Sequence, residues 1–115
     1  MNKDIKKQIT EVLKGYKDMN YKLEVLHEKL NTTLDEREEI RILNTINVIT
    51  RDKDIIDRTL ASLKDRHREA FKLKFVQGHN AEKAGKIMCC DRSNVYRYID
   101  QIIDKIYELI LLERG

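Results

Sequence analysis

The chain has 115 residues, with 23 Lys and Arg against 20 Asp and Glu and a formal net charge of +3. Its length fits one compact domain with at most an appendage. It has no proline and four glycines, and 37% of its residues are charged, so the composition predicts a nearly all-helical chain. The charge is uneven, because residues 64–98 hold nine basic and four acidic side chains, a local net charge of +5.

The sequence shows no pattern typical of secretion, membrane insertion or disulfide formation. The first basic residues are not followed by the apolar core of a secretory signal, and no apolar run approaches the roughly 20 residues of a membrane span. Cys89 and Cys90 are adjacent, and a disulfide between neighbours is strained and rare. We therefore expect free thiols, no membrane association and a cytoplasmic location.

The sequence also argues against catalysis. The Cys and His residues lack the spacing of a zinc site, and no phosphate-binding loop or glycine-rich oxyanion turn accompanies them. We also exclude a DNA recombinase. Several of these enzymes carry a C-terminal helix-turn-helix behind a catalytic domain, and 115 residues leave no room for that catalytic domain. We expect no catalytic residues, no metal, no cofactor and no enzymatic activity.

The first helical segment has an apolar stripe with alternating spacings of four and three residues, which predicts a coiled-coil-like seam over residues 5–30. Gly15 is a weak point in it, costing roughly 1 kcal/mol relative to Ala. The stripe consists of Ile5, Ile9, Val12, Tyr16, Met19, Leu23, Leu26 and Leu30.

A second helix is predicted from Thr33, because Thr33 and Glu36 fit a capping box. Lys53 stands where this helix should be apolar, which predicts either a break near residues 50–54 or a side chain that reaches out to solvent. The apolar stripe consists of Ile42, Ile46, Ile49, Ile56, Leu60 and Leu63.

Charges beside the two stripes favour an antiparallel hairpin. The first is flanked by Lys6, Lys22 and Lys29, and the second by Asp52 and Asp57. Alternatively, both stripes face one globular core, or the seam pairs two chains into a homodimer. The fold class we predict is all-α: a hairpin over residues 1–54, for packing or oligomerisation, then a helical bundle over residues 55–115 that ends in a long helix.

Three further helices are predicted in the second half. One covers residues 65–76 and ends at Gly78, and a short one covers residues 81–88 with Asn80 as its N-cap. Asp91 caps the last helix, which we expect to run to about Leu112. Its apolar stripe is widened by Ile103, Ile110, Leu111 and Leu112 beyond one face, which indicates a partner surface within or between chains.

The stretch "NAEKAGKIMCCDRSNVYRYID", residues 80–100, satisfies the pattern of a helix-turn-helix. Ala84 and Gly85 are small where the two helices should cross, and Cys89 occupies the turn. A non-glycine residue in a left-handed turn costs about 1 kcal/mol. Met88, Cys90, Val95 and Tyr98 would then face inward.

The outward positions of the second helix can read DNA. Arginine pairs with guanine and asparagine with adenine, while Ser and Tyr hydroxyls reach phosphates. We predict that this helix enters the major groove with Arg92, Ser93, Asn94, Tyr96 and Arg97.

Residues 60–106, "LASLKDRHREAFKLKFVQGHNAEKAGKIMCCDRSNVYRYIDQIIDKI", resemble region four of bacterial sigma factors. The small size and the helical first half are similar to phage late-gene activators of the RinA and ArpU type. The family's first motif helix usually has Ile-Ala where this chain has Ala84-Gly85, and its turn usually has glycine where this chain has Cys89. The residues that match are Leu60, Leu63, Arg66, Arg68, Glu69, Leu73, Phe75 and Gly78.

The resemblance implies a sequence-specific transcription regulator, phage or prophage encoded, that binds double-stranded promoter DNA beside bacterial RNA polymerase. The recognition helix would read an element resembling the −35 hexamer. The helix carrying Lys72 and Lys74 would add phosphate contacts or face the polymerase. The residues placed near phosphates are Asn80, Lys83, Lys86, Arg66 and Arg68.

Two other functions fit the sequence. A phage small terminase subunit also carries a helix-turn-helix and binds packaging-site DNA, but it usually places that motif before its oligomerisation helix. A polymerase- or sigma-binding adaptor without DNA contact would use the seam at residues 5–30 and the apolar tail at residues 109–112.

Overall fold

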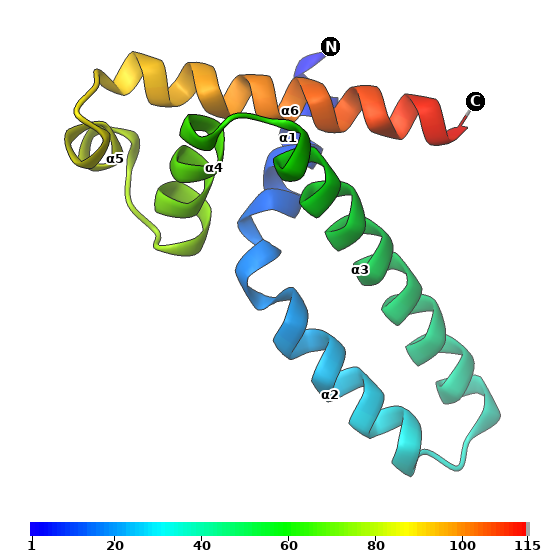
Figure 1. The fold of residues 1–115 in the computed structure, drawn as a ribbon. Helices are drawn as coiled ribbons and strands as arrows, with labels where there is room; N and C mark the ends of the chain where they lie inside the picture. Colours follow the sequence, from blue (N-terminus) through cyan, green and yellow to red (C-terminus); the bar gives the residue numbers. More distant parts are fainter. Residues whose placement is uncertain (115) are drawn as a thin grey trace.

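The structure is a computed structural model that describes residues 1–114. The predicted all-α fold is confirmed, since no strand occurs among the described residues. Figure 1 shows the arrangement of the helices. In chain order the elements are α1 (Lys3–Lys14), the 3-10 turn η1 (Tyr16–Asp18), α2 (Met19–Thr32), α3 (Glu36–Ser62), α4 (Asp65–Phe71), the π-helical turn η2 (Lys72–Val76), α5 (Ala81–Met88) and α6 (Arg92–Arg114).

The molecule is elongated, with principal extents of 53 × 32 × 24 Å. The helices α2 and α3 form an antiparallel hairpin that projects away from the other elements (Figure 1). At the opposite end of α3, the long helix α6 crosses both α3 and α1. The helices α4 and α5 pack on the N-terminal half of α6, so α6 connects the hairpin with the predicted DNA-binding region.

The predicted seam over residues 5–30 does not form one straight helix. The chain bends at Gly15 and η1, after which α2 pairs with α3 while α1 packs on α6. The bend changes which side chain is buried in α1. Leu13 is 0% exposed, whereas Val12, which the seam predicts as buried, is 36% exposed. The prediction of Val12 as a core residue is therefore wrong, because α1 faces α6 rather than continuing the seam with α3.

Two predictions about α3 are also wrong. The helix begins at Glu36 with Asp35 as its N-cap, and the Asp35 carboxylate accepts a hydrogen bond from the Arg37 amide at 3.0 Å. Thr33 instead ends α2. The helix then runs to Ser62 without the break considered for residues 50–54. The predicted division between residues 54 and 55 falls inside α3, so one helix spans both predicted regions, and the division itself stays a prediction.

One hydrophobic core joins the N-terminal helix to the second half of the chain. Side chains of α1, α2, α3, α4, η2, α5 and α6 all contribute to it, so α1 and the predicted DNA-binding region share buried surface. Its buried members are Ile9, Leu13, Met19, Ile55, Ile56, Ala70, Phe71, Leu73, Phe75, Ala81, Ala84, Met88, Val95, Ile99, Ile102, Ile103 and Ile106.

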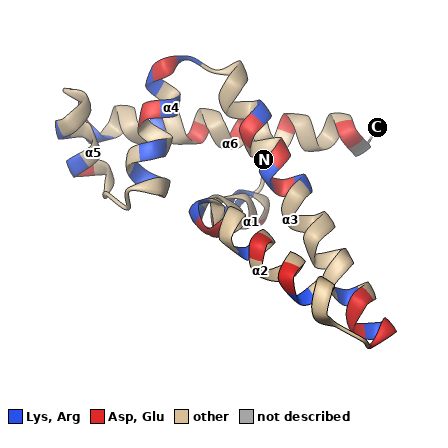
Figure 2. Ribbon diagram, turned by 60° about the horizontal axis from the view of Figure 1, so that its bottom comes forward, with Lys and Arg blue, Asp and Glu red and all other residues tan. Residues whose placement is uncertain are grey.

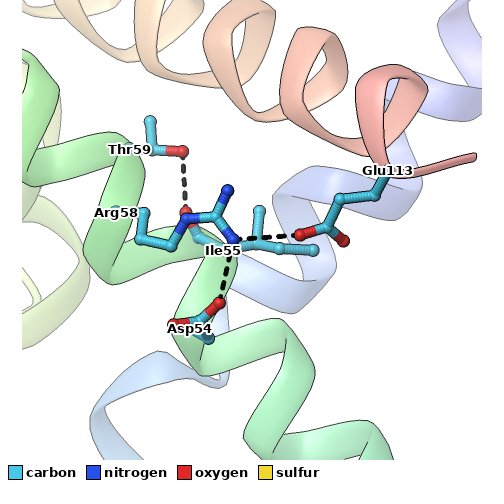
Figure 3. A network of polar contacts seen from close by, with 5 residues as sticks. All are labelled: Asp54, Ile55, Arg58, Thr59 and Glu113. Carbon is cyan, nitrogen blue, oxygen red and sulfur yellow. Dashed lines mark hydrogen bonds and ion pairs between the residues drawn. The ribbon is translucent and has the colours of Figure 1, made fainter. Parts of the chain in front are cut away.

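A polar junction fixes the end of α6 against α3 (Figure 3). The Arg58 guanidinium lies 3.1 Å from an Asp54 carboxylate oxygen and 3.0 Å from one of Glu113, so it joins neighbouring turns of α3 to the last turn of α6. Beside it, the fully buried Thr59 hydroxyl donates a hydrogen bond to the Ile55 carbonyl at 2.8 Å. This bond satisfies the only buried polar side chain in the described core.

A second polar network ties the bend after α1 to α3. The Tyr16 hydroxyl donates to Asp57 at 2.5 Å, and the Lys53 ammonium lies 2.6 Å from the other oxygen of the same carboxylate. Lys53 therefore has a partner within the hairpin region, which explains how a cation fits the inner face of α3. Burial, together with the hydrogen bond and negative charge of Asp57, raises the pKa of Tyr16 to about 12.

This network predicts a stability loss at high pH that depends on Tyr16. A tyrosine in the unfolded chain has a pKa of roughly 10. Folding raises the pKa of Tyr16 and therefore favours its neutral form. Because the folded pKa is raised to about 12, the stabilisation is complete below pH 10 and is lost as the pH rises from 10 to 12. Urea unfolding at a series of pH values should show wild type more stable than Tyr16→Phe at pH 8, with the difference shrinking above pH 10. A difference that stays constant with pH would contradict this assignment.

Candidate nucleic-acid interface

The helix α5 and the turn that follows it match the sequence prediction. The Asn80 side chain accepts a hydrogen bond from the Lys83 amide at 2.8 Å and caps the start of α5. The helix ends at Cys89, which has φ 57° and ψ 43° in the left-handed region, as predicted for the turn. Its amide donates to the Lys86 carbonyl, and the Cys90 amide donates to the Gly85 carbonyl at 2.8 Å, which together close the helix end.

Gly85 lets α5 approach the turn and the start of α6 closely. A Cβ built on Gly85 would lie 2.7 Å from the Cys90 carbonyl oxygen and 3.2 Å from the Arg92 amide nitrogen. Both neighbours are backbone atoms, so they cannot move aside as a flexible side chain would. The prediction that a small residue is needed at this crossing is confirmed. In Figure 1, α5 appears nearly end-on while α6 lies across the view, so the two helices cross steeply.

The start of α6 is capped by Asp91. Its carboxylate accepts a hydrogen bond from the Ser93 amide at 2.9 Å, and its carbonyl accepts one from the Asn94 amide at 3.0 Å. The bonds from the Ser93 backbone and side chain lower the pKa of Asp91 below its ordinary value, so the cap is ionised at neutral pH. The first turn of α6 is thereby held in a defined orientation relative to α5.

The inner face of α6 is anchored, and its outer face is exposed. Val95 is fully buried in the core that also contains Met88 and Ala84 of α5. The five predicted recognition residues lie together on the first two turns: Arg92, Ser93, Tyr96 and Arg97 are exposed, and Asn94 is half-buried. Among the described side chains, Arg92 and Arg97 form no ion pair, so both guanidinium groups remain open to a ligand.

Two cationic side chains near this surface lie close to tyrosine rings. Arg97 lies over the Tyr98 ring with 5.6 Å between guanidinium carbon and ring centroid, and Lys74 of η2 lies 6.0 Å from the centroid of Tyr96. Lys74 therefore stands beside the recognition positions. Such contacts restrict long cationic side chains without neutralising them.

The residues predicted near phosphates divide into two groups. Lys83 and Lys86 are exposed on α5, and the Lys86 ammonium lies 3.9 Å from Glu82, a weak surface pair. Asn80 is exposed at the start of the same helix, although its side-chain oxygen is engaged in the cap. Of these three positions, Lys86 lines a shallow surface depression together with Arg92 at the start of α6, and the exposed ammonium groups of Lys83 and Lys86 are accessible to an anion.

Arg66 and Arg68 have contacts within the protein that the sequence did not reveal. Arg68 donates to the Leu60 carbonyl at 2.9 Å and to the Leu63 carbonyl, and it also pairs with Asp65. Its guanidinium therefore holds the corner between α3 and α4. Arg66 donates to the Met88 carbonyl at 3.0 Å, at the last residue of α5. Both side chains position helices, and their predicted phosphate contacts stay a prediction.

His67 is a further positioning residue that sequence reasoning missed. Its Nε2 lies 2.5 Å from the Gln101 side-chain oxygen, and its ring packs edge-on against Tyr98 at a centroid distance of 5.0 Å. These contacts lock α4 onto α6 next to the recognition positions. No local sequence pattern predicts these contacts, because 34 residues separate His67 from Gln101.

The charge distribution is consistent with an anionic ligand at this end of the molecule. Figure 2 shows blue segments on α4 and its continuation and on α5, with some red among them, while α2 and α3 carry both red and blue segments. The described residues contain no cluster of three or more His, Cys, Asp or Glu side chains that could hold a metal ion. None of the helices over residues 1–114 is both long and apolar enough to cross a membrane.

Comparisons with known proteins add no assignment. No protein-family model matches the chain. No curated protein and no solved structure matches it significantly.

Proposed function

We propose that this protein is a sequence-specific, double-stranded DNA-binding regulator of transcription that reads DNA with the first two turns of α6. The single observation that carries the proposal is the exposed set of Arg92, Ser93, Tyr96 and Arg97 on a helix whose inner face is locked against α5. A helix that projects in this way fits the major groove of B-DNA. The likeness to sigma factor region four adds promoter DNA and bacterial RNA polymerase as proposed partners, and a phage or prophage gene as the proposed source.

Each group has a separate role in the proposed complex. Arg92 and Arg97 read base edges, since arginine forms two parallel hydrogen bonds with guanine, and Asn94 is suited to adenine. Lys83 and Lys86 contact phosphates, which fixes the position of the helices on the duplex without specifying sequence. Gly85 and Asp91 hold the two helices at the angle that presents α6, so they act on binding through geometry.

The experiment compares wild type with Arg92→Ala/Arg97→Ala. Wild type is first used to select duplexes from a randomised DNA pool, and affinities for the enriched sequence are then measured by electrophoretic shift. We expect the double variant to lose about 1–3 kcal/mol per lost base contact, or roughly five- to 150-fold each. An unchanged affinity and an unchanged enriched sequence in the double variant would contradict the recognition-helix assignment.

Three further variants distinguish the reading of base sequence from a general effect of positive charge. Arg37→Ala/Arg41→Ala removes the same number of guanidinium groups from exposed positions on the hairpin and should leave binding nearly unchanged. Lys83→Ala and Lys86→Ala should each weaken binding to all sequences alike and reduce the salt dependence by about one unit of slope. If wild type shows no salt-dependent binding to any duplex, the proposed function is wrong.

A further inference from the structure

The hairpin helix α3 has a surface opposite to α2 for which the DNA-binding proposal gives no role. Val48, Arg51, Asp52 and Ile55 have the spacing i, i+3, i+4 and i+7, so they form one stripe along the helix. We call these four residues the α3 stripe. Together with Ile110 of α6 they line a groove on the surface.

The α3 stripe combines exposed apolar surface with two charges that lack partners. Val48 is 59% exposed. Arg51 is exposed and Asp52 is half-buried, and neither forms an ion pair or side-chain hydrogen bond with a described side chain. The neighbouring charges Asp54 and Arg58 are already engaged with each other and with α6 (Figure 3).

Asp52 occupies an unfavourable position in the single chain. It lies at the edge of a second, almost wholly apolar cavity lined by residues of α1, α3 and α6. Burial raises the pKa of Asp52, and the positive charge of Arg51 opposes this only in part. A partly desolvated carboxylate without a hydrogen bond is destabilising, and a cation brought to it would relieve the cost.

We propose that a second copy of this chain covers the α3 stripe, with the two α3 helices crossing antiparallel about a two-fold axis between residues 51 and 52. In that register Arg51 of each copy lies opposite Asp52 of the other, so two equivalent ion pairs form. Val48 of each copy lies over the groove of the other, where Ile55, only 5% exposed, and the half-buried Ile110 form part of the lining. The stripe is therefore complementary to itself in charge, as a two-fold interface requires.

The self-complementary charge order favours a second copy over an unrelated partner. A partner of one charge sign would pair with either Arg51 or Asp52 and leave the other unmatched in the interface, which is costly. The exposed Leu111 and Leu112 follow Ile110 on α6 and add apolar surface to the end of that helix. The recognition positions lie at the other end of α6, which has 23 residues and spans about 34 Å, so the dimer leaves them exposed.

The test is the oligomeric state of the full chain, measured without DNA by light scattering coupled to size exclusion over a concentration series. Wild type should show twice the chain mass of 13.7 kDa. Arg51→Glu alone places Glu opposite Asp52, and Asp52→Lys alone places Lys opposite Arg51. Each change should raise the dissociation constant by about tenfold or more, because both symmetric pairs become repulsive.

Mixing the two variants distinguishes the proposed register from other arrangements. In a heterodimer of Arg51→Glu with Asp52→Lys, each interface pair again joins opposite charges, so an equimolar mixture should recover the dimer mass. Arg37→Glu, a matched charge reversal at an exposed position of α3, should remain dimeric. Val48→Asp should dissociate, whereas Leu34→Asp at the fully exposed hairpin tip should not.

Three outcomes would overturn the dimer: a wild type that has the single-chain mass throughout, single variants that remain dimeric, or a mixture no more associated than its components. Because no DNA is present, these results do not depend on the proposed function. A chain that dimerises but binds no DNA would disprove the proposed function alone, and a monomer that binds DNA would disprove the dimer alone.

Discussion

Replacing Gly85 with Ala is expected to destabilise the folded chain by about 1–3 kcal/mol, because the added methyl group overlaps backbone atoms. The new Cβ would lie 2.7 Å from the Cys90 carbonyl oxygen, a separation that real Cβ atoms essentially never show. The turn between α5 and α6 must then move. Urea unfolding followed by circular dichroism measures the loss of stability, and it should be accompanied by weaker DNA binding because α6 changes its angle.

The other glycines provide the controls for this prediction. Gly15 has an ordinary right-handed conformation, and a Cβ there meets nothing closer than the Val12 carbonyl oxygen at 3.5 Å. Gly15→Ala should therefore be neutral or stabilise the chain by about 0.4–1 kcal/mol. Gly78 has φ +76° with open space around it, so Gly78→Ala should cost about 1 kcal/mol from backbone strain alone. If Gly85→Ala behaves like Gly15→Ala, the close crossing of α5 and α6 is wrong.

Replacing Leu13 with Ala should have the largest effect on stability, about 2–5 kcal/mol, because it leaves a cavity where α1 meets α3 and α6. Leu13 is fully buried in the core that also contains Ile102 and Ile106 of α6. The loss should lower the unfolding midpoint of the entire chain. Helicity and tyrosine fluorescence should therefore shift together in a denaturant titration.

Val12→Ala is the matched control, since it removes an aliphatic side chain from the adjacent position. Val12 is partly exposed, so we expect a loss of about 1 kcal/mol or less. The straight seam over residues 5–30 predicts the reverse order, with Val12 the more costly substitution. A larger effect at position 12 than at position 13 would show that α1 continues the seam instead of packing on α6.

The local chemistry of the chain was sufficient to predict the ends of α5 and the start of α6. Asn80 caps α5, Cys89 takes the left-handed conformation that ends it, and Asp91 caps α6, as expected from the sequence. Each of these features depends on hydrogen bonds to residues no more than five positions away, so the side chain and its neighbours determine them. The Thr33 and Glu36 capping box was wrong because Asp35, equally capable as a cap, stands two residues later.

Only the placement of the predicted site residues can be compared with the structure, and their role in binding stays a prediction. The recognition positions of α6 lie together and exposed because helical periodicity alone separates them from Val95 and Ile99 on the buried side. The roles of Arg66 and Arg68 could not be predicted in the same way. An arginine in a basic helix has the same local pattern whether it meets a phosphate or, as Arg68 does, the carbonyls at the end of the preceding helix.

What the amino-acid sequence determined by itself was the all-α class, the ends of α5 and α6, and the outward face of the first turns of α6, because all three follow from short-range hydrogen bonding and periodicity. Only the tertiary structure decided that Leu13 is buried in place of Val12, that α3 continues past Lys53, and that α1 shares a core with α6. These outcomes depend on contacts between distant residues, such as Tyr16 with Asp57 across 41 positions. The partner of a helix face is chosen by the burial of the entire chain, and no window of a few residues contains that information.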